Sequence, residues 1–105
     1  MIYVIATIDL KKGCREEFVE KHLRNVPNVK AEKGCINYEP AIDIDSGLPA
    51  QGELRDDVVT VVESWESVEA LQDHFKAPHM LSFREATKAL VNQVSIQVLM
   101  PARDA

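Results

Sequence analysis

With 105 residues, 46% of them hydrophobic, the chain is long enough for one domain with a single hydrophobic core. It has 17 acidic and 12 basic residues and a formal net charge of −5, so it lacks the positive charge that binding to nucleic acid or to an anionic membrane surface requires. The N-terminus has neither the basic segment nor the cleavage site of a secretory signal, and we expect a cytosolic protein. The cysteines form no CxxC unit and the histidines no HExxH motif, so we predict neither a metal nor a haem site.

The first part of the chain predicts a strand, a helix and a second strand. Residues 2–10 are rich in Ile, Val and Thr, which is typical of a buried strand. Residues 15–33 carry an apolar stripe with helical spacing, and Pro27 inside this stripe should kink or restart the helix. Gly34 is the expected stop signal. Residues 35–42 then predict the second strand.

The second part predicts a long connection followed by a strand, an interrupted helix and a last strand. Residues 43–57 contain Gly, Pro, Ser and several acidic residues and have no strand or helix period. Residues 58–65 begin with β-branched residues and predict a strand. Ser67 is suited to cap the next helix, which Pro78 should interrupt and restart. Residues 94–100 predict the final strand.

This order of elements predicts an α+β domain with a ferredoxin-like βαββαβ topology, an antiparallel sheet and both helices on one face. Strand residues of both parities are apolar, as in Val4 beside Ile5 and Val61 beside Val62. Strands of this kind are buried on both faces. Since helices can cover only one face, we expect the other face to meet a second copy of the chain in a two-fold homodimer.

Several blocks of the sequence together resemble a known family. They are GCINYEPAID, VVESWES, HFKAPHM and the FREA behind it, with Pro27 in the first helix and the long connection before the third strand. Their order and spacing are similar to those of the small bacterial quinol monooxygenases of the antibiotic-biosynthesis monooxygenase family, across nearly the whole chain. No single block is diagnostic, and the evidence lies in the four blocks being in register.

The resemblance implies a dimeric α+β barrel with a pocket between the sheet and the helices of each subunit. It implies oxidation of a quinol or a similar aromatic, electron-rich phenol by O2, with no flavin, haem or metal cofactor. In the related haem-degrading branch a histidine and an asparagine stand where this chain has Arg84 and Ala6, which argues against haem degradation. Two alternatives stay open: an isomerase of phosphorylated signal molecules within the same family, and a non-catalytic dimeric binding module.

Glu63, Trp65 and His79 are the first candidates for chemistry. Trp65 could stack on an aromatic substrate, or it could be a core residue beneath the second helix. Glu63 shares its strand face and could be a base with a raised pKa, or could hold a helix by a hydrogen bond. His79 could be the general base, or could fix the break in the second helix. Because the ordinary pKa of an imidazole, about 6.5, already suits neutral pH, His79 is preferred over Glu63 as the base.

Further candidates for substrate binding are His22, Asn37, Tyr38 and Arg84. His22 lies on the apolar stripe of the first helix and could be a hydrogen-bonded core residue or could line the pocket. Arg84 could reach the pocket and bind an anionic intermediate, or could remain on the surface. Asn37 and Tyr38 are adjacent in a strand and must point to opposite faces, but the sequence does not decide which one faces the helices. His74 is expected at the boundary between core and solvent, in a structural role.

Overall fold

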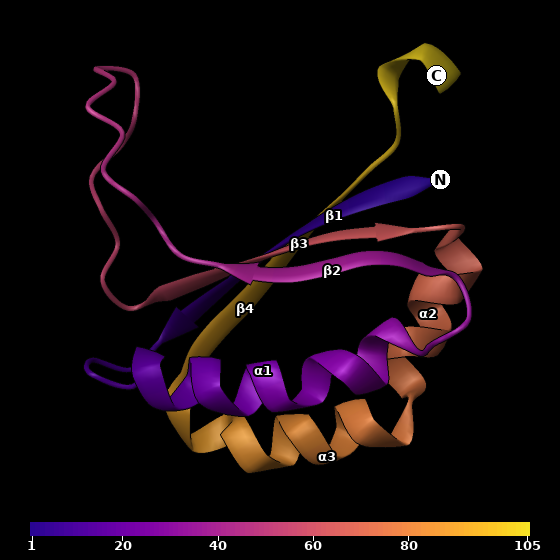
Figure 1. The fold of residues 1–105 in the computed structure, drawn as a ribbon, viewed down its shortest axis with the longest axis horizontal. Coiled ribbons are helices and arrows are strands. Elements are labelled where there is room, and N and C mark those ends of the chain that lie inside the picture. Colours follow the sequence, from indigo (N-terminus) through magenta and orange to yellow (C-terminus); the bar gives the residue numbers. More distant parts are fainter.

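The structure, a computed structural model, describes all 105 residues as one α+β domain (Figure 1). Four strands form a single sheet, and three helices lie on one side of it. In chain order the elements are β1 (Ile2–Leu10), α1 (Arg15–Lys30), β2 (Cys35–Ala41), β3 (Val58–Trp65), α2 (Val68–Lys76), α3 (Pro78–Thr87) and β4 (Val91–Leu99), with 3-10 turns at Lys88–Leu90 and Ala102–Asp104. The expected ferredoxin-like topology is confirmed.

The sheet has the strand order β2-β3-β1-β4, and every neighbouring pair is antiparallel. Strands β1 and β3 occupy the centre, where Ile5 pairs with Val62 and Ala6 with Val61. In β1 the side chains of Val4, Ala6 and Ile8 are buried beneath the helices, whereas Ile5 and its neighbours of the same parity are only half-buried. The helices therefore cover one face and leave the other without a covering layer.

Local sequence signals set most element boundaries. The Ser67 hydroxyl accepts a hydrogen bond from the Ala70 amide at 3.1 Å, which caps α2 as expected. Pro78 opens α3 after an extended residue, so the predicted interruption is confirmed. Gly34 adopts a φ of +87°, a backbone conformation that favours glycine, and a Cβ there would lie 2.6 Å from the Ala70 Cβ. Gly34 thus allows β2 to start directly against α2.

The end of α1 and the start of β4 each differ from the sequence-based expectation by three residues. Helix α1 ends at Lys30 rather than at residue 33, and residues 31–34 form a turn instead. The helix continues through Pro27, which lies in its last turn, where one missing amide donor removes only one hydrogen bond. Strand β4 begins at Val91, three residues earlier than expected, because its backbone pairs with Leu10 at the end of β1.

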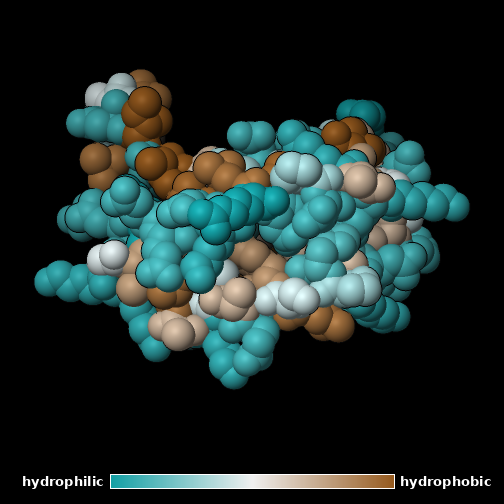
Figure 2. All heavy atoms as spheres, turned by 60° about the horizontal axis from the view of Figure 1, so that its bottom comes forward, coloured by the Kyte–Doolittle hydropathy of each residue, from teal (hydrophilic) through white to brown (hydrophobic).

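Two segments project beyond the sheet on the side away from the helices, namely the connection 42–57 and the C-terminal residues (Figure 1). The connection carries exposed apolar side chains, including Ile44 and Leu48, and hydrophobic atoms gather on it in Figure 2, while the helix side is largely hydrophilic. Asp43 and Arg55 close its base with two side-chain hydrogen bonds of 2.8 and 2.9 Å. None of the helices has the length and hydropathy needed to span a bilayer.

Candidate active site

A small cavity of about 90 Å³ lies between the sheet and the helices. Its wall is mostly apolar, with a few ionisable side chains. Strand β4 closes one side with Val94 and Ile96, which are partly exposed because no helix covers this edge strand. The other lining residues are Ala6, Ile8, His22, Tyr38, Val61, Glu63, His74, Phe75, Met80, Phe83 and Arg84. An apolar cavity with a few converging polar groups is the usual form of a small-molecule site.

Glu63 is a buried carboxylate on the cavity wall. It is separated from Trp65 by one residue of β3, so both side chains point toward the helices, and the Trp65 Nε1 donates to Glu63 Oε1 at 2.9 Å. Burial raises the pKa of Glu63 to about 7, an effect that the Trp65 hydrogen bond opposes and the nearby Glu32 charge reinforces. Glu63 is therefore able to exchange a proton near neutral pH.

His22 and Tyr38 form a second polar pair in the cavity wall. The Tyr38 hydroxyl lies 3.2 Å from His22 Nε2, and the two rings stack with centroids 5.3 Å apart. Burial, assisted by the neighbouring His74, lowers the pKa of His22 to about 4. Burial also raises the pKa of Tyr38 above its usual value. At neutral pH this pair consists of a neutral imidazole and an un-ionised phenol.

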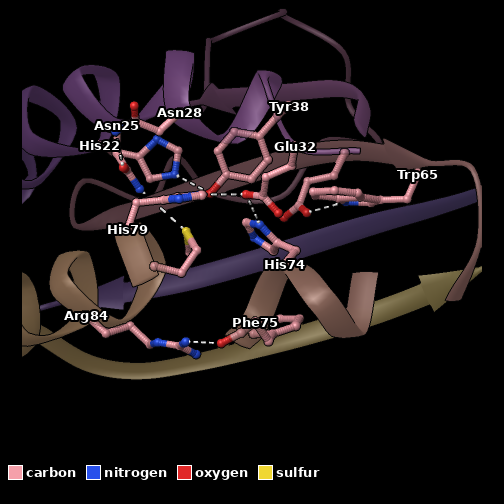
Figure 3. Close-up of polar contacts among 12 residues, drawn as sticks. His22, Asn25, Asn28, Glu32, Tyr38, Trp65, His74, Phe75, His79 and Arg84 are labelled. Carbon is pink, nitrogen blue, oxygen red and sulfur yellow. Dashed lines mark hydrogen bonds and ion pairs between the residues drawn. The ribbon is translucent and has the colours of Figure 1, made fainter. Parts of the chain in front are cut away.

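A third group joins Glu32, His74 and His79 (Figure 3). Glu32 Oε2 accepts from His74 Nδ1 at 2.9 Å and from His79 Nε2 at 2.7 Å. The side chains of Glu32 and His74 are only 12% and 3% exposed, whereas that of His79 is 26% exposed. Burial lowers the pKa of His74, while its hydrogen bond to Glu32 acts in the opposite direction. One carboxylate thus holds two imidazoles, which come from different helices.

Arg84 and Phe75 stand at the exposed rim of the cavity. The Arg84 guanidinium donates to the Phe75 backbone carbonyl, and its central carbon lies 5.8 Å from the centroid of the Phe75 ring. These contacts hold a positive charge at the cavity mouth, where it can attract an anionic substrate or intermediate.

Comparison with known proteins places this arrangement in a family. Residues 1–86 match the sequence profile of the antibiotic biosynthesis monooxygenases. Over 103 residues the chain is 35% identical to the probable quinol monooxygenase YgiN of Escherichia coli K12, covering 96% of this chain and 98% of that protein. This chain belongs to the antibiotic biosynthesis monooxygenase family. The predicted resemblance is thereby confirmed.

Solved structures show the same fold at lower identity. The crystal structure of PA3566 from Pseudomonas aeruginosa has a TM-score of 0.77 at 26% identity, covering 95% of this chain and 92% of that one. The structure of Rv0793 from Mycobacterium tuberculosis has a TM-score of 0.76 at 24% identity, with 95% and 93% covered. The second likeness concerns the fold alone.

In this family member the sequence-predicted site residues fall into two groups. His22, Tyr38, Glu63 and Arg84 line the cavity. The other three do not: Trp65 is fully buried behind Glu63, Asn37 is exposed on the uncovered face, and His79 faces a groove between α1 and α3. The open question about the second strand is settled, because Tyr38 and not Asn37 points toward the helices.

Sequence reasoning missed Glu32 and misplaced His74. Glu32 lies in the turn after α1, where no periodic pattern marks it. His74 was expected at the boundary with solvent, but it is only 2% exposed and lines the cavity. The available signal was its spacing of three residues from Leu71, which places both on the buried stripe of α2. The chain contains no group of three or more His, Cys, Asp or Glu side chains arranged to hold a metal ion.

Proposed function

We propose that the protein oxidises a quinol or a similarly electron-rich phenol with O2 in this cavity, without a cofactor. The observation that carries the proposal is the cavity wall, which is apolar enough to hold an aromatic ring and also bears ionisable groups that can take a phenolic proton. The name of the curated relative, probable quinol monooxygenase, supports the same substrate class.

The chemistry needs no external reductant. One dihydroquinone and one O2 give one hydroxyquinone and one water: one oxygen atom enters the ring, the other is reduced, and the quinol supplies the electrons. Removal of a phenolic proton makes the ring a better electron donor to O2. The protein then has to orient the ring, exclude bulk water and accept the proton.

The residues divide these tasks according to where they lie. Arg84 at the rim favours an anionic ring, and Tyr38 with His22 offers a polar contact inside the cavity. Of the two bases predicted from the sequence, Glu63 reaches the wall, and His79 can act only through Glu32. Trp65 supports Glu63 from behind.

Oxygen uptake with ¹⁸O₂ tests the proposal. Monocyclic and bicyclic dihydroquinones are supplied in turn, and we expect one labelled oxygen per hydroxyquinone formed, with one O2 consumed. The control is Ile96→Trp. Ile96 lies in the edge strand β4 at the exposed side of the cavity, and the larger side chain should fill the cavity and abolish the enzymatic part of the uptake. Uptake no faster than in protein-free buffer, or an unlabelled quinone with hydrogen peroxide, would reject monooxygenation.

We also infer that two copies assemble through the uncovered face of the sheet. Ile5 and Val62 pair at its centre, and Val62 is 39% exposed in the isolated chain. The connection 42–57 and the C-terminal residues project on this side, where they would contact a second subunit. Burial of this apolar surface would drive the association.

A further inference from the structure

We propose that the imidazole of His74 takes the phenolic proton of the substrate, and that Glu32 and His79 are positioning residues that hold this imidazole ready. This inference rests on the quinol-oxidising function proposed above, and it names the proton acceptor that the function requires.

The hydrogen bonds of His74 leave one ring nitrogen free. Its Nδ1 donates to Glu32 Oε2 at 2.9 Å, which fixes the tautomer and places the lone pair on Nε2. Nε2 has no hydrogen-bond partner in the chain. The only fully buried side-chain polar atoms that lack a partner are His22 Nδ1 and Thr60 Oγ1, so Nε2 of His74 is not one of them. Since His74 lines the cavity, Nε2 is the ring nitrogen available to a ligand there. A base oriented by a carboxylate on its far nitrogen is a recurring arrangement in enzymes.

Electrostatics favours His74 over Glu63 as the acceptor. When His74 accepts a proton, the new positive charge forms 2.9 Å from the Glu32 carboxylate. Burial opposes the charged form of both side chains, but the Glu32 carboxylate offsets part of this penalty at His74 and adds to it at Glu63. Charge that forms beside a pre-oriented opposite charge costs less than charge that forms beside a like one.

His79 acts through Glu32 and does not touch the cavity. Its Nε2 donates to the same carboxylate oxygen at 2.7 Å, so Glu32 is held from α2 and from α3 at once (Figure 3). The ring of His79 faces the groove between α1 and α3, and its side chain is 26% exposed. Removing His79 would leave Glu32 with a single donor and free to turn away from His74.

The proton-transfer step balances by itself. The phenolic O–H bond breaks, the electron pair stays on the substrate oxygen, and a new N–H bond forms at His74 Nε2. After electron transfer to O2, the imidazolium returns the proton to the reduced oxygen. The titratable or charged groups that face His74 from the surrounding elements are His22, Glu32, Tyr38, Glu63, His79 and Arg84.

Turnover kinetics over a range of pH provide the first test. His74→Ala should lower kcat on the order of 10²-fold or more, as is usual for a general base. In wild type, kcat/KM should rise with pH as His74 loses its proton. Glu32→Gln keeps the side-chain shape but removes the charge that stabilises the imidazolium, so the midpoint of this rise should move to lower pH while the plateau falls about 10-fold, because the base is weaker.

Two further variants separate positioning from folding. His79→Ala should lower kcat several-fold, and His79→Gln, whose amide can still donate to Glu32, should recover part of it. Glu69→Gln, at an exposed site in the first turn of α2, is the matched control for the charge change and should keep the wild-type profile. Imidazole added to His74→Ala should restore turnover in proportion to its concentration.

A test without turnover uses 4-nitrophenol, which absorbs visible light strongly only when ionised. At a given pH a larger fraction should be ionised when bound to wild type than when bound to His74→Ala or Glu32→Gln. Wild type that consumes no oxygen but shows this ordering would reject the proposed function and keep His74 as a proton acceptor. Equal ionisation in all three proteins, failure of the nitrophenol to bind, or a Glu63→Gln variant that loses turnover while His74→Ala retains it would overturn the inference.

Discussion

The two faces of the sheet are built by the same strands but differ in what they bury. On the face covered by helices, Val4, Ala6 and Val61 are at most 7% exposed. On the other face, Ile5 is half-buried and its pairing partner Val62 is 39% exposed. Ile5 and Val62 are at least as large as Val4, Ala6 and Val61, yet nothing in one chain covers them.

This difference separates two tasks. The covered face combines a closed core with a buried polar cluster around Glu63 and His74, and such a cluster is costly to bury unless its groups are paired. The uncovered face has no comparable network of buried charges. The two proposals assign chemistry to the covered face and assembly to the uncovered one, and each assignment can be tested by variants that affect only one face.

The largest effect is expected on assembly. A double substitution, Ile5→Asp with Val62→Asp, puts two like charges in the middle of the uncovered face, and we expect sedimentation to change from the mass of two chains to that of one. Leu23→Asp, on the exposed side of α1 where Leu23 is 52% exposed, is the control and should leave the mass unchanged. A wild-type protein that sediments as a single chain at micromolar concentration would refute the role of this face.

On the covered face, Glu63→Gln should stabilise the protein at alkaline pH. The pKa of Glu63 rises from 4.5 when unfolded to about 7 when folded, so the folded state binds the extra proton between these values. Wild type should therefore lose stability as the pH rises from about 4.5 to about 7, by about 3 kcal/mol, and then level off.

The Glu63→Gln variant has no titrating group at this position, but its side-chain amide oxygen can still accept the hydrogen bond from Trp65 Nε1. Urea unfolding at several pH values should show the two proteins equal near pH 4 and the variant more stable above pH 7. A difference that stays constant with pH would mean that Glu63 is not buried as a carboxylate.

A pair of glycine substitutions tests the packing of α2 at the start of β2. Gly13→Ala and Gly34→Ala both place a side chain at a positive φ, which costs about 1 kcal/mol. Only at Gly34 does the new Cβ meet a neighbour, the Ala70 Cβ at 2.6 Å. We expect Gly34→Ala to lose about 2 kcal/mol more than Gly13→Ala in urea unfolding, in the range of an overpacked core. Equal losses would show that α2 moves aside without cost.

Local signals made the fold predictable, and long-range packing limited the prediction of the site. Three predictions depend only on neighbouring residues, and all are confirmed: the β-branched run of β3, the Ser67 cap and the break at Pro78. The start of β4 depends on its pairing with β1, more than 80 residues away, and was missed. Glu32 is a site residue only because it contacts His74 and His79, which lie 42 and 47 residues further along the chain. No periodicity encodes such contacts.

The smallest effect compares the two tyrosines, one on each face. Tyr38 is 4% exposed on the covered face, and its hydroxyl is the partner of His22 Nε2 at 3.2 Å. Tyr38→Phe should therefore lose about 1 kcal/mol, the usual net contribution of one hydrogen bond, because the imidazole nitrogen stays buried without a partner. Tyr3→Phe, the control, removes the hydroxyl of a half-buried side chain on the uncovered face, far from this pair, and should change stability by much less. Both variants are compared with wild type by urea unfolding at one protein concentration. Without the Tyr38 hydroxyl, Nε2 of His22 is easier to protonate. The difference in unfolding free energy between the two variants should therefore become smaller below the His22 pKa of about 4. Equal losses from both variants would mean that the polar pair on the covered face contributes nothing beyond its stacking, and the cavity wall would then be held by packing alone.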